Sequence, residues 1–161
     1  MEHIYPNIAN RLRAEVPSLK TIDVEDGQLD DRENAFPITY PAVFINVTDA
    51  VWSDVSRLAQ MGEVTIDVSV AIQLNHRTKQ GSPDMAKLAS QLLLMREVNV
   101  ALHGWAGADM SRLTRTRSQI RLSKQGVKVW MHTYKCQIKD SLTMPTTTLT
   151  PKPPIEVEFT A

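Results

Sequence analysis

The chain has 161 residues, of which 42% are apolar and 22% charged, and this is enough material for one globular core. Its 18 basic residues balance 18 acidic ones, so no net charge favours nucleic acid or an anionic membrane as a partner. A single cysteine excludes an internal disulfide framework. The sequence has no apolar run near the about 20 residues of a membrane span and no signal-peptide layout, which predicts a soluble, cytosolic domain.

A short helix is predicted over residues 4–16. Its apolar residues recur every four positions and form one stripe, consisting of Ile4, Ile8, Leu12 and Val16. Pro17 ends this pattern, because proline cannot continue a helix. A brief extended segment with Leu19, Ile22 and Val24 follows.

The next segment, residues 23–33, is strongly acidic. Six of its eleven residues are Asp or Glu, so little of it can be buried and we expect a long exposed loop. A calcium-binding EF-hand loop needs glycine at its sixth position and glutamate at its twelfth. Counted from Asp23, Gly27 is fifth and Asn34 is twelfth, so the segment does not fit this motif.

Two segments further along predict strands. The continuous apolar run at 42–47 is typical of a strand covered on both faces. Residues 49–61 are compatible with a short helix or with one arm of a twisted hairpin. From 64 to 74, apolar and polar residues alternate, which predicts a strand with one buried face. At about 3.4 Å per residue this strand is roughly 37 Å long, so it either bends or extends beyond its own core.

A longer helix is predicted from Pro83 to about His103, with Gly104 following its end. Its apolar residues fall on two sides of the helical wheel. One face holds Met85, Leu88, Leu92, Met95, Val98 and Leu102, and the other holds Ala86, Ala89, Leu93 and Val100. In a small domain only one side can lie on the sheet, so we expect Ala89, Leu93 and Val100 to contact another layer or another subunit.

The last part of the domain is predicted to be a β-hairpin with strands at 114–122 and 127–139. Strand geometry puts Arg115, Arg117 and Arg121 on one face as a row. In the second strand the apolar alternation changes phase, which predicts a β-bulge near His132-Thr133.

A Pro- and Thr-rich arm, residues 141–161, follows the α+β domain of residues 1–140. It ends in an alternating strand pattern that has no partner of its own, with Ile155, Val157 and Phe159 as the apolar residues. We expect this arm to leave its own domain and to dock on a sheet edge or in a groove.

No catalytic motif is present in the sequence. A phosphate-binding loop, a nucleophile elbow and a helical zinc-binding motif are all absent. The histidines fall on different predicted elements, and Cys136 alternates with apolar residues. We therefore expect no enzyme, no cofactor and no metal site. A buried pocket of substrate size would contradict this if it were lined by two or more of His76, His103, His132 and Cys136.

One pattern favours nucleic-acid binding. Trp130, His132 and Tyr134 alternate with other residues and are flanked by Lys128 and Lys135, as in sheet-type RNA binders that stack bases on aromatic rings. The segment after the turn glycine lacks the aromatic consensus of such proteins, and the net charge is zero. We therefore expect no specific nucleic-acid partner.

The order of these elements resembles the tail terminator (tail-completion) proteins of long-tailed bacteriophages. The resemblance covers roughly residues 1–140. It is carried by 40–45, the excursion through Trp52 to Gln60, 63–70, the helix 83–103 and the strands 114–122 and 127–139. It implies an α+β fold: a mixed, mainly antiparallel sheet of four to five strands with one long amphipathic helix and a short N-terminal helix packed on it.

The same resemblance implies a structural virion protein without cofactors. Members of this family assemble as homohexameric rings, cap the finished tail tube and present a surface to the head-side connector. Such a protein would be assembled in the bacterial host cytoplasm and found in the virion. The alternatives are a stand-alone α+β ligand-binding or enzymatic domain, or a sheet-type nucleic-acid binder.

The segregation of charge along the chain suggests how subunits could pair. Exposed ion pairs contribute only about 0–1 kcal/mol each, too little to order a long loop within one chain. Repeated between subunits, they set register and reject wrong partners. We therefore expect the arginine row (Arg115, Arg117 and Arg121) to face a neighbouring subunit or the docking surface, with Asp30, Asp31 or Glu33 as counterparts.

Overall fold

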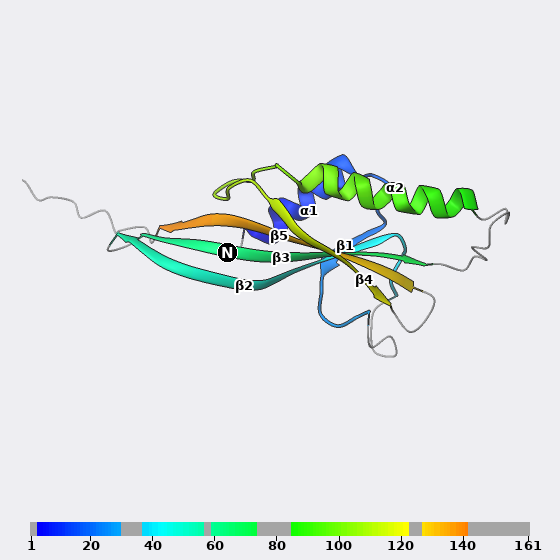
Figure 1. Ribbon diagram of the computed structural model, residues 1–161, viewed down its shortest axis with the longest axis horizontal. Coiled ribbons are helices and arrows are strands. Elements are labelled where there is room, and N and C mark those ends of the chain that lie inside the picture. The colour runs from blue at the N-terminus through cyan, green and yellow to red at the C-terminus, as the bar shows by residue number, and fades with distance from the viewer. Residues whose placement is uncertain (1–2, 30–36, 57–58, 74–84, 123–126, 142–161) are drawn as a thin grey trace, which may run out of the picture.

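The computed structural model describes residues 3–29, 37–56, 59–73, 85–122 and 127–141 (Figure 1). It contains two helices and a five-stranded mixed sheet, which confirms the predicted α+β class. The elements in chain order are α1 (Ile4–Glu15), β1 (Thr21–Val24), β2 (Ala42–Ser56), β3 (Ala59–Gln73), α2 (Met85–Leu102), β4 (Thr114–Leu122) and β5 (Val127–Ser141).

The strand order in the sheet is β1-β2-β3-β5-β4. The short β1 is parallel to β2, and all other neighbours are antiparallel. β3 has 15 residues, longer than the predicted 64–74. It is paired with β5 along its whole length and with β2 from Ala59 to Ala71. Residues 49–56 of the ambiguous segment are therefore the arm of a hairpin and not a helix, because β2 continues to Ser56 and pairs antiparallel with β3.

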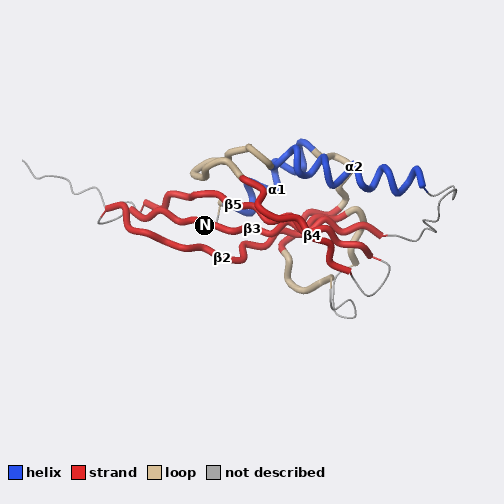
Figure 2. Tube along the Cα trace, in the orientation of Figure 1, coloured by secondary structure: helices blue, strands red, loops and turns tan. Residues whose placement is uncertain are grey.

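Both helices lie on one side of the sheet (Figure 2). The predicted stripe of α1 is buried there, and Val64, Ile66, Val68 and Val70 of β3 form the opposing surface. Figure 1 shows that α2 covers one end of the sheet and that β2 and β3 extend well beyond the helices at the other end. Neither described helix has the length and apolar composition needed to cross a membrane.

The opposite face of the sheet is also covered near its β1 end, which corrects the prediction that the long strand has one buried face. Ser69 and Ala71 of β3 are fully buried there. The chain after β1 folds over this face, and Leu29 joins a second cluster with Ala42, Phe44, Ala71, Val127 and Val129. The acidic segment is thus not exposed throughout, because Leu29 is buried and Glu25 Oε2 accepts a hydrogen bond from Ser69 Oγ at 3.1 Å.

The C-terminal hairpin is formed as predicted, but its bulge lies on the other strand. β5 pairs with β3 through His132 and Thr133 without a shift in register. The irregularity occurs in β4, between Arg115 and Arg117. The change of phase in β5 has another cause. At the start of the strand the buried residues Val127 and Val129 pack in the second cluster, whereas from Trp130 onward every second residue packs in the core on the helix side.

The end of α2 agrees with the sequence. The helix runs from Met85 to Leu102, within the predicted 83–103. Gly104 has a φ of 81°, the left-handed conformation that terminates many helices and that glycine adopts without strain. Its N–H donates to the carbonyl oxygen of Leu113, so this turn leads the chain toward β4.

A close contact at the free end of the sheet generates the first prediction. Gly62 is paired with Trp52 across β2 and β3, and a Cβ at residue 62 would lie 2.9 Å from the indole Cζ3. Gly62→Ala should therefore displace the indole from its place against the helix-side core and lower the free energy of unfolding by about 1–2 kcal/mol. Urea unfolding followed by tryptophan fluorescence measures this change.

A second substitution shows whether the indole is the cause. In a Trp52→Leu background, Gly62→Ala should cost less, because the clashing ring is gone. An unchanged unfolding midpoint for Gly62→Ala alone would contradict the prediction.

Candidate assembly interface

The described histidines and Cys136 take part in different contacts and do not gather into one site. His132 Nδ1 is 2.8 Å from Ser118 Oγ, and His103 Nδ1 accepts the backbone N–H of Arg115 at 3.1 Å. Cys136 is buried, and burial raises the pKa of its thiol to about 11. Within the described ranges, no three His, Cys, Asp or Glu side chains come together as a possible metal site. His76 lies outside these ranges.

The aromatic set of β5 does not form a stacking platform. Trp130, His132 and Tyr134 are all buried, on the side of the sheet that carries the helices. Tyr134 Oη donates to Asn99 Oδ1 of α2 at 3.2 Å, and burial raises the pKa of this phenol well above its ordinary value. Bases could not reach these rings without unpacking the core, which removes the observation behind the nucleic-acid interpretation.

The outer face of α2 carries several exposed apolar side chains. Leu93 is 54% and Val100 68% exposed, and Ala86 and Ala89 are exposed as well. These are the four residues of the predicted second face. Leu92, predicted on the core face, is instead 46% exposed. Leu92 is exposed because it lies away from the buried face on the helical wheel. That buried face is formed by Leu94, Val98, Ala101 and Leu102.

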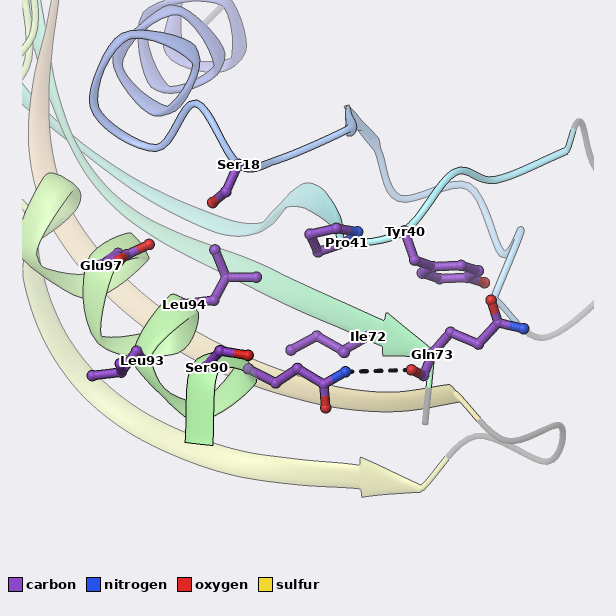
Figure 3. Close-up of a pocket in the computed structure, with 10 residues that line it drawn as sticks. Ser18, Tyr40, Pro41, Ile72, Gln73, Ser90, Leu93, Leu94 and Glu97 are labelled. Carbon is purple, nitrogen blue, oxygen red and sulfur yellow. Dashed lines mark hydrogen bonds between the residues drawn. The ribbon is translucent and has the colours of Figure 1, made fainter. Parts of the chain in front are cut away.

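A groove runs beside this face, between α2 and the start of β2. It has a volume of about 620 Å³. Figure 3 shows α2 forming one wall, with the chain around Ser18 and Pro41 opposite and Ile72 between them. The lining residues are Ser18, Tyr40, Pro41, Ile72, Gln73, Ser90, Gln91, Leu93, Leu94 and Glu97. We call this the main groove.

A smaller groove of about 350 Å³ continues along α2 toward its C-terminal end. It shares Leu93 and Glu97 with the main groove and lies between α2 and α1. Arg11 connects the two helices here, because its Nε donates to the carbonyl oxygen of Ala101 at 3.1 Å. Its Nη1 donates to Glu15 Oε1 of the same helix at 2.6 Å. The two grooves and the outer face of α2 therefore form one continuous surface.

The arginine row is divided by the bulge in β4, which corrects its predicted geometry. Arg115 is paired with Tyr134, whose ring faces the helices, whereas Arg117 is paired with the adjacent Thr133. Neighbouring residues of β5 face opposite sides of the sheet, so Arg115 and Arg117 do as well. Arg121 is paired with Val129 in the register of β4 and β5. The predicted row is therefore broken between Arg115 and Arg117.

The free end of the sheet adds features that sequence reasoning missed. Val51 is 63% and Val55 58% exposed there. Lys135 Nζ pairs with Glu63 Oε1 at 2.6 Å, and Thr133 Oγ1 donates to Asp67 Oδ1 at 2.6 Å. The apolar residues within the ambiguous segment 49–61 were the signal that could have placed a projecting hairpin here.

The remaining predicted interface residues lie outside the described part of the chain. These are Asp30, Asp31 and Glu33 of the acidic segment and Ile155, Val157 and Phe159 of the arm.

Comparisons with known proteins identify the family. The family model described as "Phage tail terminator protein" matches residues 4–141, so the chain belongs to this family and the resemblance is confirmed. A solved structure described as "Virion of native gene transfer agent (GTA) particle" contains a chain with a similar fold. The TM-score is 0.53 at 13% identity, with 84% of this chain and 94% of the other covered. A search of curated proteins found no match.

The buried imidazole of His132 generates the second prediction. Burial and the nearby charge of Arg115 lower its pKa below the ordinary 6.5, and Nε2 has no hydrogen-bond partner within the described structure. As the pH falls below about 6.5, the unfolded chain binds a proton at this residue and the folded chain does not. The free energy of unfolding should therefore decrease below that pH, by at most about 1.4 kcal/mol per pH unit.

Urea unfolding at several pH values measures this dependence. His132→Gln should remove this part of the pH dependence, whatever it does to the stability itself. The exposed His3→Gln serves as the control and should keep it. Equal slopes for wild type and His132→Gln would contradict the prediction.

Proposed function

We propose that this phage tail terminator family member forms a homo-oligomeric ring that caps the tail tube and joins it to the head-side connector. The family match over residues 4–141 carries this proposal, because it spans all seven described elements. The family is one of structural phage proteins. The resemblance implies six subunits in the ring.

The surface of the described chain supports a role in assembly. An apolar helix face bordered by grooves and a sheet end with exposed valines are features of contact surfaces rather than of a reaction centre. Within the described part of the chain, His132 and Cys136 are buried, and His103 Nδ1 accepts the backbone N–H of Arg115. We therefore assign no enzymatic activity and no cofactor to the protein.

The proposed partners are other copies of this chain, the tail tube protein and the connector protein. The protein would be assembled in the host cytoplasm and remain in the virion. For contacts between copies, we propose Arg115, Arg117 and Arg121 as basic positions and Asp30, Asp31 and Glu33 as acidic ones. The division of the arginines between two faces means that a single acidic segment cannot pair with all three at once.

One observation supports a second candidate, a stand-alone ligand-binding domain. The main groove has the volume of a small-molecule site, about 620 Å³. Its lining combines apolar side chains with uncharged polar ones and a single carboxylate, Glu97. Light scattering separates the two functions, because a ring has a mass several times that of the monomer and a stand-alone domain does not.

Deleting the gene from its phage or prophage tests the role in the tail. We expect particles with heads and tails that are not joined, and tail tubes of irregular length, seen by negative-stain electron microscopy. Wild-type protein supplied in trans should restore joined particles. Normal particles in the deletion strain would contradict the proposed function.

The third prediction concerns the basic positions in assembly. Arg117→Glu should weaken the oligomer several-fold, with the largest effect at low salt, because it replaces attraction across an interface by repulsion. Light scattering over a range of protein and salt concentrations measures this effect. Asp31→Lys in the same chain should restore part of the assembly.

Arg13→Glu is a matched control, because Arg13 is also exposed but lies on α1, away from the sheet. Normal assembly of Arg117→Glu at low salt would mean that this arginine is only solvated.

A further inference from the structure

We propose that the main groove and the adjoining outer face of α2 bind the C-terminal segment 153–159 of a neighbouring subunit. The proposal deepens the proposed function and rests on it, since it names the contact through which adjacent copies of a ring would hold one another. The main groove of one copy and the C-terminal segment of the next copy would then form the two sides of one interface.

The lining of the main groove fits an apolar segment. Leu93 and Leu94 form the α2 wall, Ile72 lies at the base, and Tyr40 and Pro41 form the opposite wall (Figure 3). Leu93 is more than half exposed in the single chain, and a segment in the groove would bury it. Burial of such side chains is the main favourable contribution to association.

The groove also contains an unsatisfied hydrogen-bond acceptor. Gln91 lines the groove, and its Nε2 donates to the carbonyl oxygen of Gln73 at 3.5 Å. Its Oε1 is buried and has no donor among the described residues. A buried acceptor without a partner is costly, and rotation of the Gln91 amide toward the groove would let the backbone N–H of an extended segment supply the missing donor.

The C-terminal segment has the matching pattern. Ile155, Val157 and Phe159 alternate with Glu156 and Glu158, so an extended segment would present three apolar side chains on one face and two carboxylates on the other. The apolar residues would span about 13 Å at 3.3 Å per residue. The α2 wall from Ser90 to Glu97 is about 10 Å long at 1.5 Å per residue, and Val100 extends the apolar surface by one more turn.

The reach of the chain favours a neighbour over the same subunit. Ser141, the last residue of β5, is paired with Ala59, while Ile72 of the groove lies thirteen residues further along β3. At about 3.4 Å per residue these two points are roughly 44 Å apart. Figure 1 shows the same separation, with β5 ending at the free end of the sheet and α2 over the other end.

The segment that would have to cover this distance is short. Val157 is sixteen residues beyond Ser141, which gives a reach of about 50 Å at 3.1 Å per residue for a Pro-rich chain. To enter its own groove the chain would also have to cross from the sheet to the helix side, about 10 Å away. The chain would have to be almost fully extended to reach its own groove, whereas a groove on an adjacent subunit can lie closer to Ser141.

Disulfide trapping with two different chains tests the proposal and is the fourth prediction. Leu93→Cys is placed in a tagged full-length chain and Val157→Cys in an untagged one, and the mixture is oxidised gently. The native Cys136 is buried with a raised pKa, so it should not compete. We expect a tagged–untagged heterodimer on non-reducing gels, several-fold above that formed when Arg13→Cys replaces Leu93→Cys.

Three outcomes would overturn the proposal. The first is a heterodimer yield no higher than that of the Arg13→Cys control. The second is a crosslink found only within single chains that carry both Leu93→Cys and Val157→Cys, which would place the segment in its own groove. The third is a dominant Leu93→Cys homodimer, which would mean that the α2 face packs against itself.

The mass of the wild-type protein, measured in parallel by light scattering, separates this proposal from the proposed function. A ring mass without the heterodimer would contradict only the docking of the segment. A heterodimer without a closed ring would support the docking and contradict the ring.

Discussion

β3 is paired with β5 over its full length and with β2 from Ala59 to Ala71, and the rest of the structure depends on this pairing. Its 15 residues connect β2 to β5 and make a sheet about 48 Å long at 3.4 Å per residue. The helices of 12 and 18 residues are only about 18 and 27 Å long. They also pack against each other, as the bond from Arg11 to Ala101 shows, so they cover one part of the sheet and leave its far end free. Because β3 is long and the helices are short, the core ends where the helices end, and the sheet beyond them is left as a surface for contacts.

Local patterns predicted the elements well because each element is governed mostly by its own sequence. The four-residue spacing of Ile8 and Leu12 located α1, and alternation located β3 and the hairpin, since these periods follow from backbone geometry alone. What alternation could not reveal was the burial of Ser69 and Ala71. Their cover comes from Leu29 and Tyr40, more than twenty residues away in the chain, and no local pattern records such a contact. The same limit applies to α2, where only the packed sheet decides that Leu94 rather than Leu92 faces the core.

The candidate interface was predicted in part for a related reason. The second apolar face of α2 was visible in the sequence because Leu93 and Val100 break the single stripe that a helix on one sheet requires. The arginine row was wrong in its geometry because one extra residue in β4 reverses the alternation after Arg115. A bulge has no strong sequence signal here, and a shift of one residue moves every later side chain to the other face. The main groove could not be predicted at all, because it arises where α2 meets the distant residues Tyr40 and Pro41.

The two kinds of surface contribute to assembly in different ways. Exposed pairs such as Lys135 with Glu63 contribute little and weaken with salt, so charges on the sheet can select register but cannot hold subunits together alone. Apolar burial is not screened, and a side chain such as Leu93 gains about 1.5–3 kcal/mol when it is fully covered. A ring stabilised only by charge would dissociate in salt, and one stabilised only by apolar contact would tolerate wrong registers. A chain that separates an apolar helix face from a charged sheet can use the first for affinity and the second for orientation. In the proposed ring, this division would give Leu93 and Val100, which are exposed in the single chain, a partner surface.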